Sequence, residues 1–84
     1  MYEVAFAESA KRGLHSLENP VQKRIIAALE RSRIRPHHFF TRLVGNDVYR
    51  MRVGDYRIIA DIKSDVLLVL VLEIGHRKKI YKRS

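Results

Sequence analysis

The sequence has no cysteine and no tryptophan, and only four glycines, two prolines and nine acidic residues among its 84. Without cysteine the chain forms neither disulfides nor thiolate metal sites, and it has no cysteine nucleophile. Its longest apolar run, residues 66–72, is far shorter than the roughly 20 residues that span a bilayer. These absences argue against a disulfide-stabilised secreted domain and a membrane-spanning helix, and predict a cytoplasmic protein without a membrane partner.

Length and charge narrow the remaining classes of protein. A chain of this length predicts one domain, residues 1–84, whose small core is marginally stable and would gain from a partner that buries more surface. Lys and Arg number 17 against nine acidic residues, which gives a net charge of +8. This excess is typical of proteins that bind a polyanion.

The first half of the chain predicts a strand followed by two helices. Apolar residues alternate with others over residues 2–6, as in a strand with one buried face. From Glu8, the spacing of Ala10, Leu14 and Leu17 is that of one helical stripe. Asn19 as N-cap and Pro20 at the first helical position begin a second helix, and Pro36 disfavours its continuation past Arg35. Its predicted buried stripe is Val21, Ile25, Ala28, Leu29 and Ser32.

The second half predicts a loop over 37–47, with a short extended piece at 41–44, and then an antiparallel meander. Its three strands span 48–53, 56–62 and 66–74. The fold is therefore α+β, with an N-terminal strand, a helical hairpin and a meander that form a four-stranded twisted sheet. The last strand is apolar on both faces except at Glu73, so it belongs inside the sheet, and its face away from the helices needs a cover.

Three arginines are predicted to share one face of this sheet. If Gly54 and Asp55 form a two-residue turn, Arg52 lies directly opposite Arg57, and period two puts Arg50 on the same face. Directly opposed like charges destabilise a sheet, so a surface selected only for folding would alternate the signs. The opposite, core-facing side is predicted to carry Tyr49, Met51, Val53, Tyr56, Ile58, Ala60 and Ile62.

The C-terminal segment adds cations interleaved with aromatic rings. Residues 76–84 contain five Lys or Arg side chains and no acid, together with His76 and Tyr81. A solvated tail is the simpler interpretation of such a charge run. Cations neutralise phosphates and a tyrosine ring stacks on a base, however, so this composition also suits single-stranded nucleic acid.

Two sequence elements carry a family resemblance. The run YRMRVGDYRIIADI (49–62) and the terminal GHRKKIY (75–81), after a short strand and a helical hairpin, resemble RelE-type toxins of the RelE/ParE superfamily. The resemblance implies a RelE-like fold, similar to microbial ribonucleases, and metal-free cleavage of mRNA in the ribosomal A site. It also implies a cognate acidic, RelB-like antitoxin, no cofactor, and the ribosome with its mRNA as partners.

The resemblance also transfers residue roles. The family's basic catalytic positions correspond to Arg50, Arg52, Arg57 and Arg77, and its terminal aromatic to Tyr81. We assign catalysis to Arg52, Arg57, Arg77 and Tyr81, and RNA binding to Arg50, His76, Lys78, Lys79 and Lys82. The implied reaction is attack of the ribose 2′-OH on the adjacent phosphate, which leaves a 2′,3′-cyclic phosphate and a 5′-OH.

The general base is left open among three residues. Well-known members have Lys where this chain has Arg50 and Arg52, and a guanidinium is a poor proton carrier. Tyr81 among cations is the first candidate and His76 the second. Glu73 is the third, if a three-residue loop in the second hairpin turns it to the arginines. The plain alternatives are a packed tyrosine, an exposed histidine and a glutamate in an ion pair.

Two rival functions remain. ParE-like members share the fold but act on DNA gyrase, so a toxin without nuclease chemistry is the second hypothesis. The third is a basic RNA-binding module without toxicity, in which the arginines have replaced the residues that move protons. No metal site is predicted, because His15, His37 and His38 lack ligand spacing.

Overall fold

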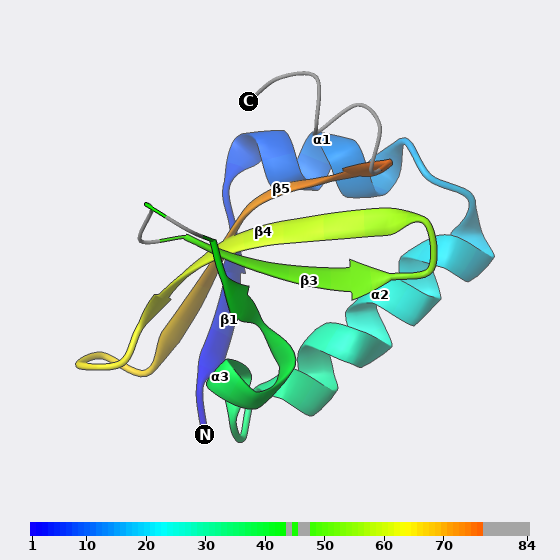
Figure 1. The fold of residues 1–84 in the computed structure, drawn as a ribbon. Coiled ribbons are helices and arrows are strands. Elements are labelled where there is room, and N and C mark those ends of the chain that lie inside the picture. The colour runs from blue at the N-terminus through cyan, green and yellow to red at the C-terminus, as the bar shows by residue number, and fades with distance from the viewer. Residues whose placement is uncertain (44, 46–47, 77–84) are drawn as a thin grey trace.

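The computed structural model describes residues 1–43, 45 and 48–76 of the chain (Figure 1). The elements follow the order β1 (Glu3–Phe6), α1 (Glu8–His15), α2 (Asn19–Ser32), α3 (Pro36–Phe39), β2 (Thr41–Arg42), β3 (Tyr49–Val53), β4 (Tyr56–Lys63) and β5 (Leu68–His76). The α+β class, the N-terminal strand, the helical hairpin and the meander are thus confirmed.

The sheet has five strands in the order β1-β5-β4-β3-β2. The prediction of four strands was wrong, because residues 41–42, which were predicted only as a short extended piece, pair with β3 as a fifth strand. β1 pairs with β5 in parallel, and all other pairs are antiparallel. β5 therefore lies inside the sheet between β1 and β4, as its apolar sequence predicted.

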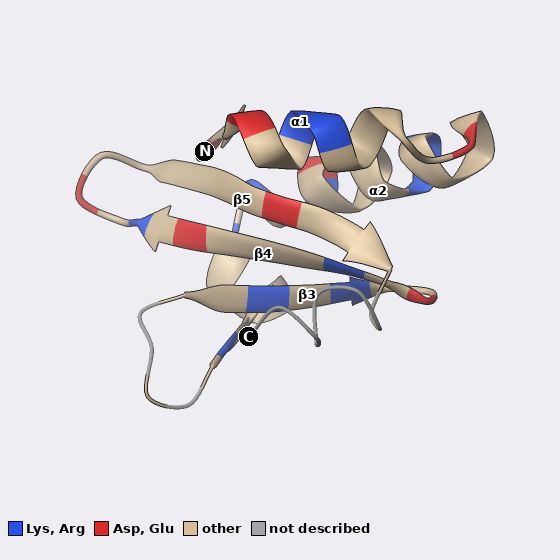
Figure 2. Ribbon diagram, turned by 90° about the horizontal axis from the view of Figure 1, so that it is seen from above, with Lys and Arg blue, Asp and Glu red and all other residues tan. Residues whose placement is uncertain are grey.

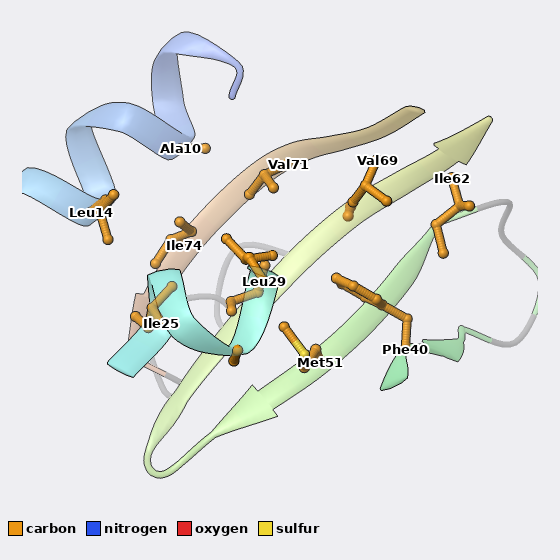
Figure 3. Close-up of a cluster of buried hydrophobic side chains, with 13 residues drawn as sticks. Ala10, Leu14, Ile25, Leu29, Phe40, Met51, Ile62, Val69, Val71 and Ile74 are labelled. Carbon is orange, nitrogen blue, oxygen red and sulfur yellow. The ribbon is translucent and has the colours of Figure 1, made fainter. Parts of the chain in front are cut away.

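Both long helices contribute to one core. Ala10 and Leu14 of α1 and Ile25, Ala28 and Leu29 of α2 are buried in the same cluster as the side chains of the three long strands (Figure 3). The strand residues of this cluster are Met51, Ile58, Ala60, Ile62, Val69, Val71 and Ile74. They share one face of the sheet, so the helices cover that face, and the predicted stripe of α2 is confirmed, with Val21 half-buried at its edge.

Several element boundaries differ from the predictions, most by one or two residues. Residues 36–39 form the short helix α3 instead of a loop, since Pro36 begins a new turn of helix. The N-cap of α2 is Glu18 instead of Asn19. The second hairpin has a four-residue turn, 64–67, so β5 begins at Leu68 and not at Val66.

α1 lies very close to β5. A Cβ placed on Gly13 would overlap the carbonyl oxygen of Ile74, so this position admits only glycine without a shift of the helix. One turn earlier, the Ser9 hydroxyl donates a hydrogen bond of 2.6 Å to the carbonyl of Leu72. The helix is thus fixed against β5 in the part of that strand that extends beyond β1.

Candidate functional site

The β3–β4 hairpin brings three arginines to one face of the sheet. Arg52 pairs with Arg57 and Arg50 pairs with Ile59, across a turn in which Gly54 has a φ of 59°. Glycine adopts this left-handed backbone without a Cβ penalty. We call the sheet face that carries Arg50, Arg52 and Arg57 the arginine face. Figure 2 shows the Lys and Arg positions along β3 and at the start of β4. They alternate with Met51 and Ile58, which are buried in the core with the helices, so the arginine face is the side of the sheet away from the helices.

The three guanidinium groups differ in exposure. Arg52 is exposed, whereas Arg50 and Arg57 are half-buried, and the Nε atom of Arg57 is buried. Partial burial holds a side chain in few rotamers and lowers the local dielectric constant, so the field that it exerts on a phosphate is stronger. The arginine face is therefore a partly preorganised cluster of cations. Such a cluster can bind a phosphate and stabilise added negative charge on it.

A β-bulge turns Glu73 to the arginine face. Ile59 pairs with Glu73 while the next residue, Ala60, pairs with Val71, so Leu72 is an extra residue in β5. Without it, period two would place Glu73 on the core-facing side with Val71. The sequence-based hypothesis made the position of Glu73 depend on a three-residue loop. The loop has four residues instead, and the bulge is what places Glu73 on the arginine face.

Three leucines of β5 lie on the same sheet face as the arginines. Leu68, Leu70 and Leu72 of β5 are half-buried, and Ile59 of β4 lies between them and the arginines. The helices lie on the other side of the sheet, so these side chains keep part of their surface accessible. The partial exposure of these leucines agrees with the prediction that this face of β5 needs a cover.

His76 lies away from the arginine face. Its register partner is Tyr56, and the two rings meet edge to face with their centroids 5.6 Å apart. The adjacent pair on that side, Ile58 and Ile74, is buried in the core. The described structure thus brings together Arg50, Arg52, Arg57 and Glu73, but not His76. Arg77, Lys78, Lys79, Tyr81 and Lys82 lie outside the described residues.

Sequence reasoning missed one cation next to the hairpin. The guanidinium of Arg24, on α2, lies against the turn, 3.3 Å from where a Cβ of Gly54 would be. This neighbour brings a positive charge from the helical layer to the end of the β3–β4 hairpin. Helical periodicity places Arg24 on the outer side of α2, but it gives no distance to a turn 30 residues away in the chain, so no sequence signal could have found the contact.

The described residues hold neither a metal-binding cluster nor a membrane-spanning helix. Within 1–43, 45 and 48–76, no three His, Asp or Glu side chains form a group that could hold a metal ion. None of the helices in the same ranges is long and apolar enough to cross a membrane.

Solved structures with the same fold include several toxins bound to antitoxins. The toxin–antitoxin complex RelBE2 from Mycobacterium tuberculosis contains a chain that matches with a TM-score of 0.76 and 26% identity, over 90% of this chain and 98% of that one. A chain of the RelB–RelE complex from Methanococcus jannaschii matches with a TM-score of 0.75 and 25% identity, over 94% and 96%. The intact RelBE complex from E. coli gives a TM-score of 0.79 at 21% identity, over 90% and 96%, which shows the shared fold.

The family assignment comes from sequence. No curated protein matches the chain. The model of one family, described as the ParE toxin of the type II toxin-antitoxin system parDE, matches residues 4–81, which is nearly the whole chain and includes both elements of the predicted resemblance. The chain therefore belongs to the ParE toxin family, within the RelE/ParE superfamily of type II toxin-antitoxin toxins.

Proposed function

We propose that the protein is a metal-independent endoribonuclease that cleaves mRNA in the ribosomal A site and thereby inhibits translation. The observation that carries this proposal is the arginine face, where Arg50, Arg52 and Arg57 project from two paired strands on the side of the sheet away from the helices. Opposed like charges destabilise a sheet, so their retention is explained by a polyanionic substrate.

The reaction that suits this face is attack of a ribose 2′-OH on the adjacent phosphate. The phosphorane that forms carries more negative charge than the ground state, and planar guanidinium groups donate two parallel hydrogen bonds to phosphate oxygens. Arg57, with its Nε buried, and Arg52 opposite it are the described residues to which we assign this stabilisation. Arg50, farther from the turn, positions the RNA backbone. By resemblance, Arg77 completes the group.

The general base is Tyr81 or Glu73 in this proposal. Glu73 has the placement that a base needs, because it lies on the arginine face, diagonal to Arg57 across the β4–β5 pair. His76 faces the opposite side of the sheet, which removes the reason for proposing it. Replacement of the base by an isosteric residue should lower the cleavage rate by about 10² to 10⁴. Glu73→Gln and Tyr81→Phe distinguish the two, and Asp61→Asn, on the same face opposite Leu70, is the control for charge alone.

The partner in this proposal is an acidic, RelB-like antitoxin. The solved structures that share the fold include RelB–RelE complexes, and the chain's net charge of +8 favours an acidic partner. We propose that the antitoxin covers the arginine face together with Leu68, Leu70 and Leu72, which would neutralise the cations and bury the leucines in one step. Because it binds the folded toxin only, it should also raise the toxin's thermal stability.

Inhibition of DNA gyrase is the second candidate function. The observation in its favour is that the matching family model is that of ParE toxins. A toxin that only blocks gyrase gives no reason to gather three guanidinium groups on one sheet face, which is why we place the nuclease first.

The decisive experiment is a single-turnover cleavage assay on programmed ribosomes, with the 3′ ends of the products analysed for 2′,3′-cyclic phosphate. Arg57→Ala should lower the rate at saturating ribosomes by about 10² to 10³, since it removes a donor to the transition state. Arg50→Ala should weaken binding more than it lowers that rate. Lys63→Ala, at the far end of β4, is the matched control and should cut at the wild-type rate. Inhibition of gyrase without RNA cleavage would replace the proposal by its alternative.

Ribosome binding should depend steeply on salt. If at least six phosphates are contacted, counterion release weakens affinity on the order of 10³-fold between about 50 and about 200 mM salt. Titration of labelled toxin into ribosomes at both salt concentrations measures this ratio. An affinity that does not change would contradict binding through phosphates.

A further inference from the structure

The exposed apolar side chains gather at the end of the fold opposite the β3–β4 turn. Six large hydrophobic side chains are exposed in the described part of the chain. Five of these belong to the chain start, the α2–α3 region and the β4–β5 turn: Met1, Ile34, Phe39, Val66 and Leu67. The sixth, Ile26, lies on the outer side of α2. We call the surface formed by the five the apolar end.

Hydrogen bonds join the three segments of the apolar end. The Tyr2 hydroxyl donates to the Ser64 hydroxyl oxygen at 3.1 Å, and the His37 ring nitrogen lies 3.2 Å from the same oxygen. The Arg33 backbone carbonyl accepts from the Tyr2 N–H at 2.8 Å, and the Leu67 carbonyl accepts from the Glu3 N–H at 2.9 Å. Each exposed apolar residue is within two positions of a residue in this network. The three segments that carry the exposed apolar residues therefore lie next to one another.

Leu67 is under backbone strain at this surface. Its φ of 53° is the left-handed value that glycine or asparagine adopts at much lower cost. A leucine that is 46% exposed and sits in this conformation is unfavourable both for its backbone and for its exposed side chain. Contact of the side chain with another molecule gives a reason for its retention.

The apolar end differs from the rest of the chain in charge. Its segments carry Arg33, Arg35 and Lys63 against Glu3 and Asp65, and two further carboxylates, Glu30 and Asp61, pair with Arg33 and Lys63 at 3.0 Å each. With Arg31, which lies between Glu30 and Arg33, these segments hold four of the 17 Lys and Arg residues and four of the nine acidic residues, so their charges balance. The remaining 13 basic and five acidic residues give the rest of the chain a strong positive charge. The apolar end is the part of the described surface that another copy could approach without strong repulsion.

We propose that the apolar end is a self-association surface, through which two copies of the chain pair end to end. A two-fold contact would place the exposed cation Arg35 of each copy within reach of the exposed carboxylates Glu3 and Asp65 of the other. The arginine face stays accessible, because Arg57 and Lys63 are separated by about 20 Å of strand. A patch of a few apolar side chains is small for a permanent interface, so the dimer is weak.

The test is sedimentation equilibrium of the full chain over a range of concentration and salt. The average mass should rise from the monomer's 9.9 kDa toward twice that value between about 1 and about 200 μM. Added salt should change the association much less than it changes ribosome binding, because it screens both the repulsion between two chains of +8 and the contacts of Arg35 with carboxylates, while apolar contacts persist. The two interactions are therefore distinguishable.

Variants locate the contact. Ile34→Asp, at a side chain that is 67% exposed, should raise the dimer dissociation constant about tenfold or more, whereas Ile26→Asp, at 39% exposure on α2, should leave it unchanged. Leu67→Asn should weaken the dimer without lowering the melting temperature, because asparagine tolerates the left-handed backbone. This third variant separates loss of contact from loss of folding.

Two results would overturn the proposal. One is a chain that stays monomeric to about 200 μM at every salt concentration. The other is a monomeric chain whose complex with a partner protein is weakened by Ile34→Asp, since the apolar end would then belong to that partner. Neither result bears on the proposed nuclease activity, which is measured by the product ends.

Discussion

The two faces of the sheet are formed by the same strands but serve different purposes. On the face under the helices, Ile58 and Val71 are buried and pack against α1 and α2. On the other face, one residue away along the chain, Arg57 and Arg52 oppose each other. Folding accounts for the first face, whereas the second opposes folding through like-charge repulsion. The comparison teaches that stability and the proposed chemistry are carried by alternate residues of one hairpin, so each can be changed with little effect on the other.

The largest expected difference is between two neighbouring isoleucines of β4. Ile58→Ala should lower the free energy of unfolding by about 2 to 5 kcal/mol, because it leaves a cavity in the core. Ile59→Ala, on the half-buried arginine face, should lower it by less than about half as much. Urea denaturation of both variants measures the difference. Equal losses would mean that the two faces are packed equally well and would break the comparison.

A smaller loss is expected at the contact between α1 and β5. Gly13→Ala should destabilise the protein by about 1 to 3 kcal/mol, since the added methyl group meets the Ile74 carbonyl oxygen and the helix must move. His15→Ala, exposed at the end of the same helix, is the control and should have a smaller effect. Thermal unfolding followed by circular dichroism provides the measurement. A wild-type melting temperature for Gly13→Ala would show that α1 is not fixed against β5.

The hydrogen bond from Ser9 to the bulge should contribute less to stability than the loss expected for Gly13→Ala. Ser9→Ala removes the donor to the Leu72 carbonyl and should lower stability by about 0.5 to 1.5 kcal/mol. Because this carbonyl belongs to the bulged residue, the variant should also loosen the position of Glu73. If Glu73 is the base, the cleavage rate of Ser9→Ala should fall in folded protein. A drop in stability without a change in rate would point to Tyr81 instead.

The smallest expected effect is a gain in stability instead of a loss. Arg52→Ala removes one of two directly opposed cations and should raise stability by about 0.2 to 1 kcal/mol at low salt. The gain should shrink as salt screens the repulsion in the wild type. Urea denaturation at two salt concentrations tests this, with exposed Arg31→Ala on α2 as the control. A loss of stability would show that Arg52 contributes to folding and would blur the distinction between the faces.

Patterns with a fixed period were predictable from the sequence. Alternation over residues 49–62, with glycine at the turn, sufficed to place Arg50, Arg52 and Arg57 together, because a two-residue turn determines the register of a hairpin. The stripe of α2 from Ile25 to Ser32 followed in the same way from helical spacing. Both are local features, so neighbouring residues carry the whole signal.

Features that depend on tertiary contacts were not predictable. The bulge at Leu72 lies in an apolar run whose residues suit either face. Its position is defined by the register with β4 and by the hydrogen bond from Ser9, and both are tertiary contacts. β2 has two residues and is a strand only because β3 lies beside it. The contact of Arg24 with the β3–β4 turn and the gathering of the apolar end join segments that are far apart in the chain.

The bulge also affects how relatives of this chain should be compared with it. Leu72 divides β5 into two segments in which even and odd positions exchange faces: Val69 and Val71 point to the core before it, and Ile74 after it. A one-residue gap at this position in an alignment of two relatives would therefore be a change of face and not a neutral deletion. A homologue that lacks the extra residue would turn the counterpart of Glu73 into the core. Such a homologue should carry an apolar residue there, so sequences alone can identify which members of the family share this carboxylate.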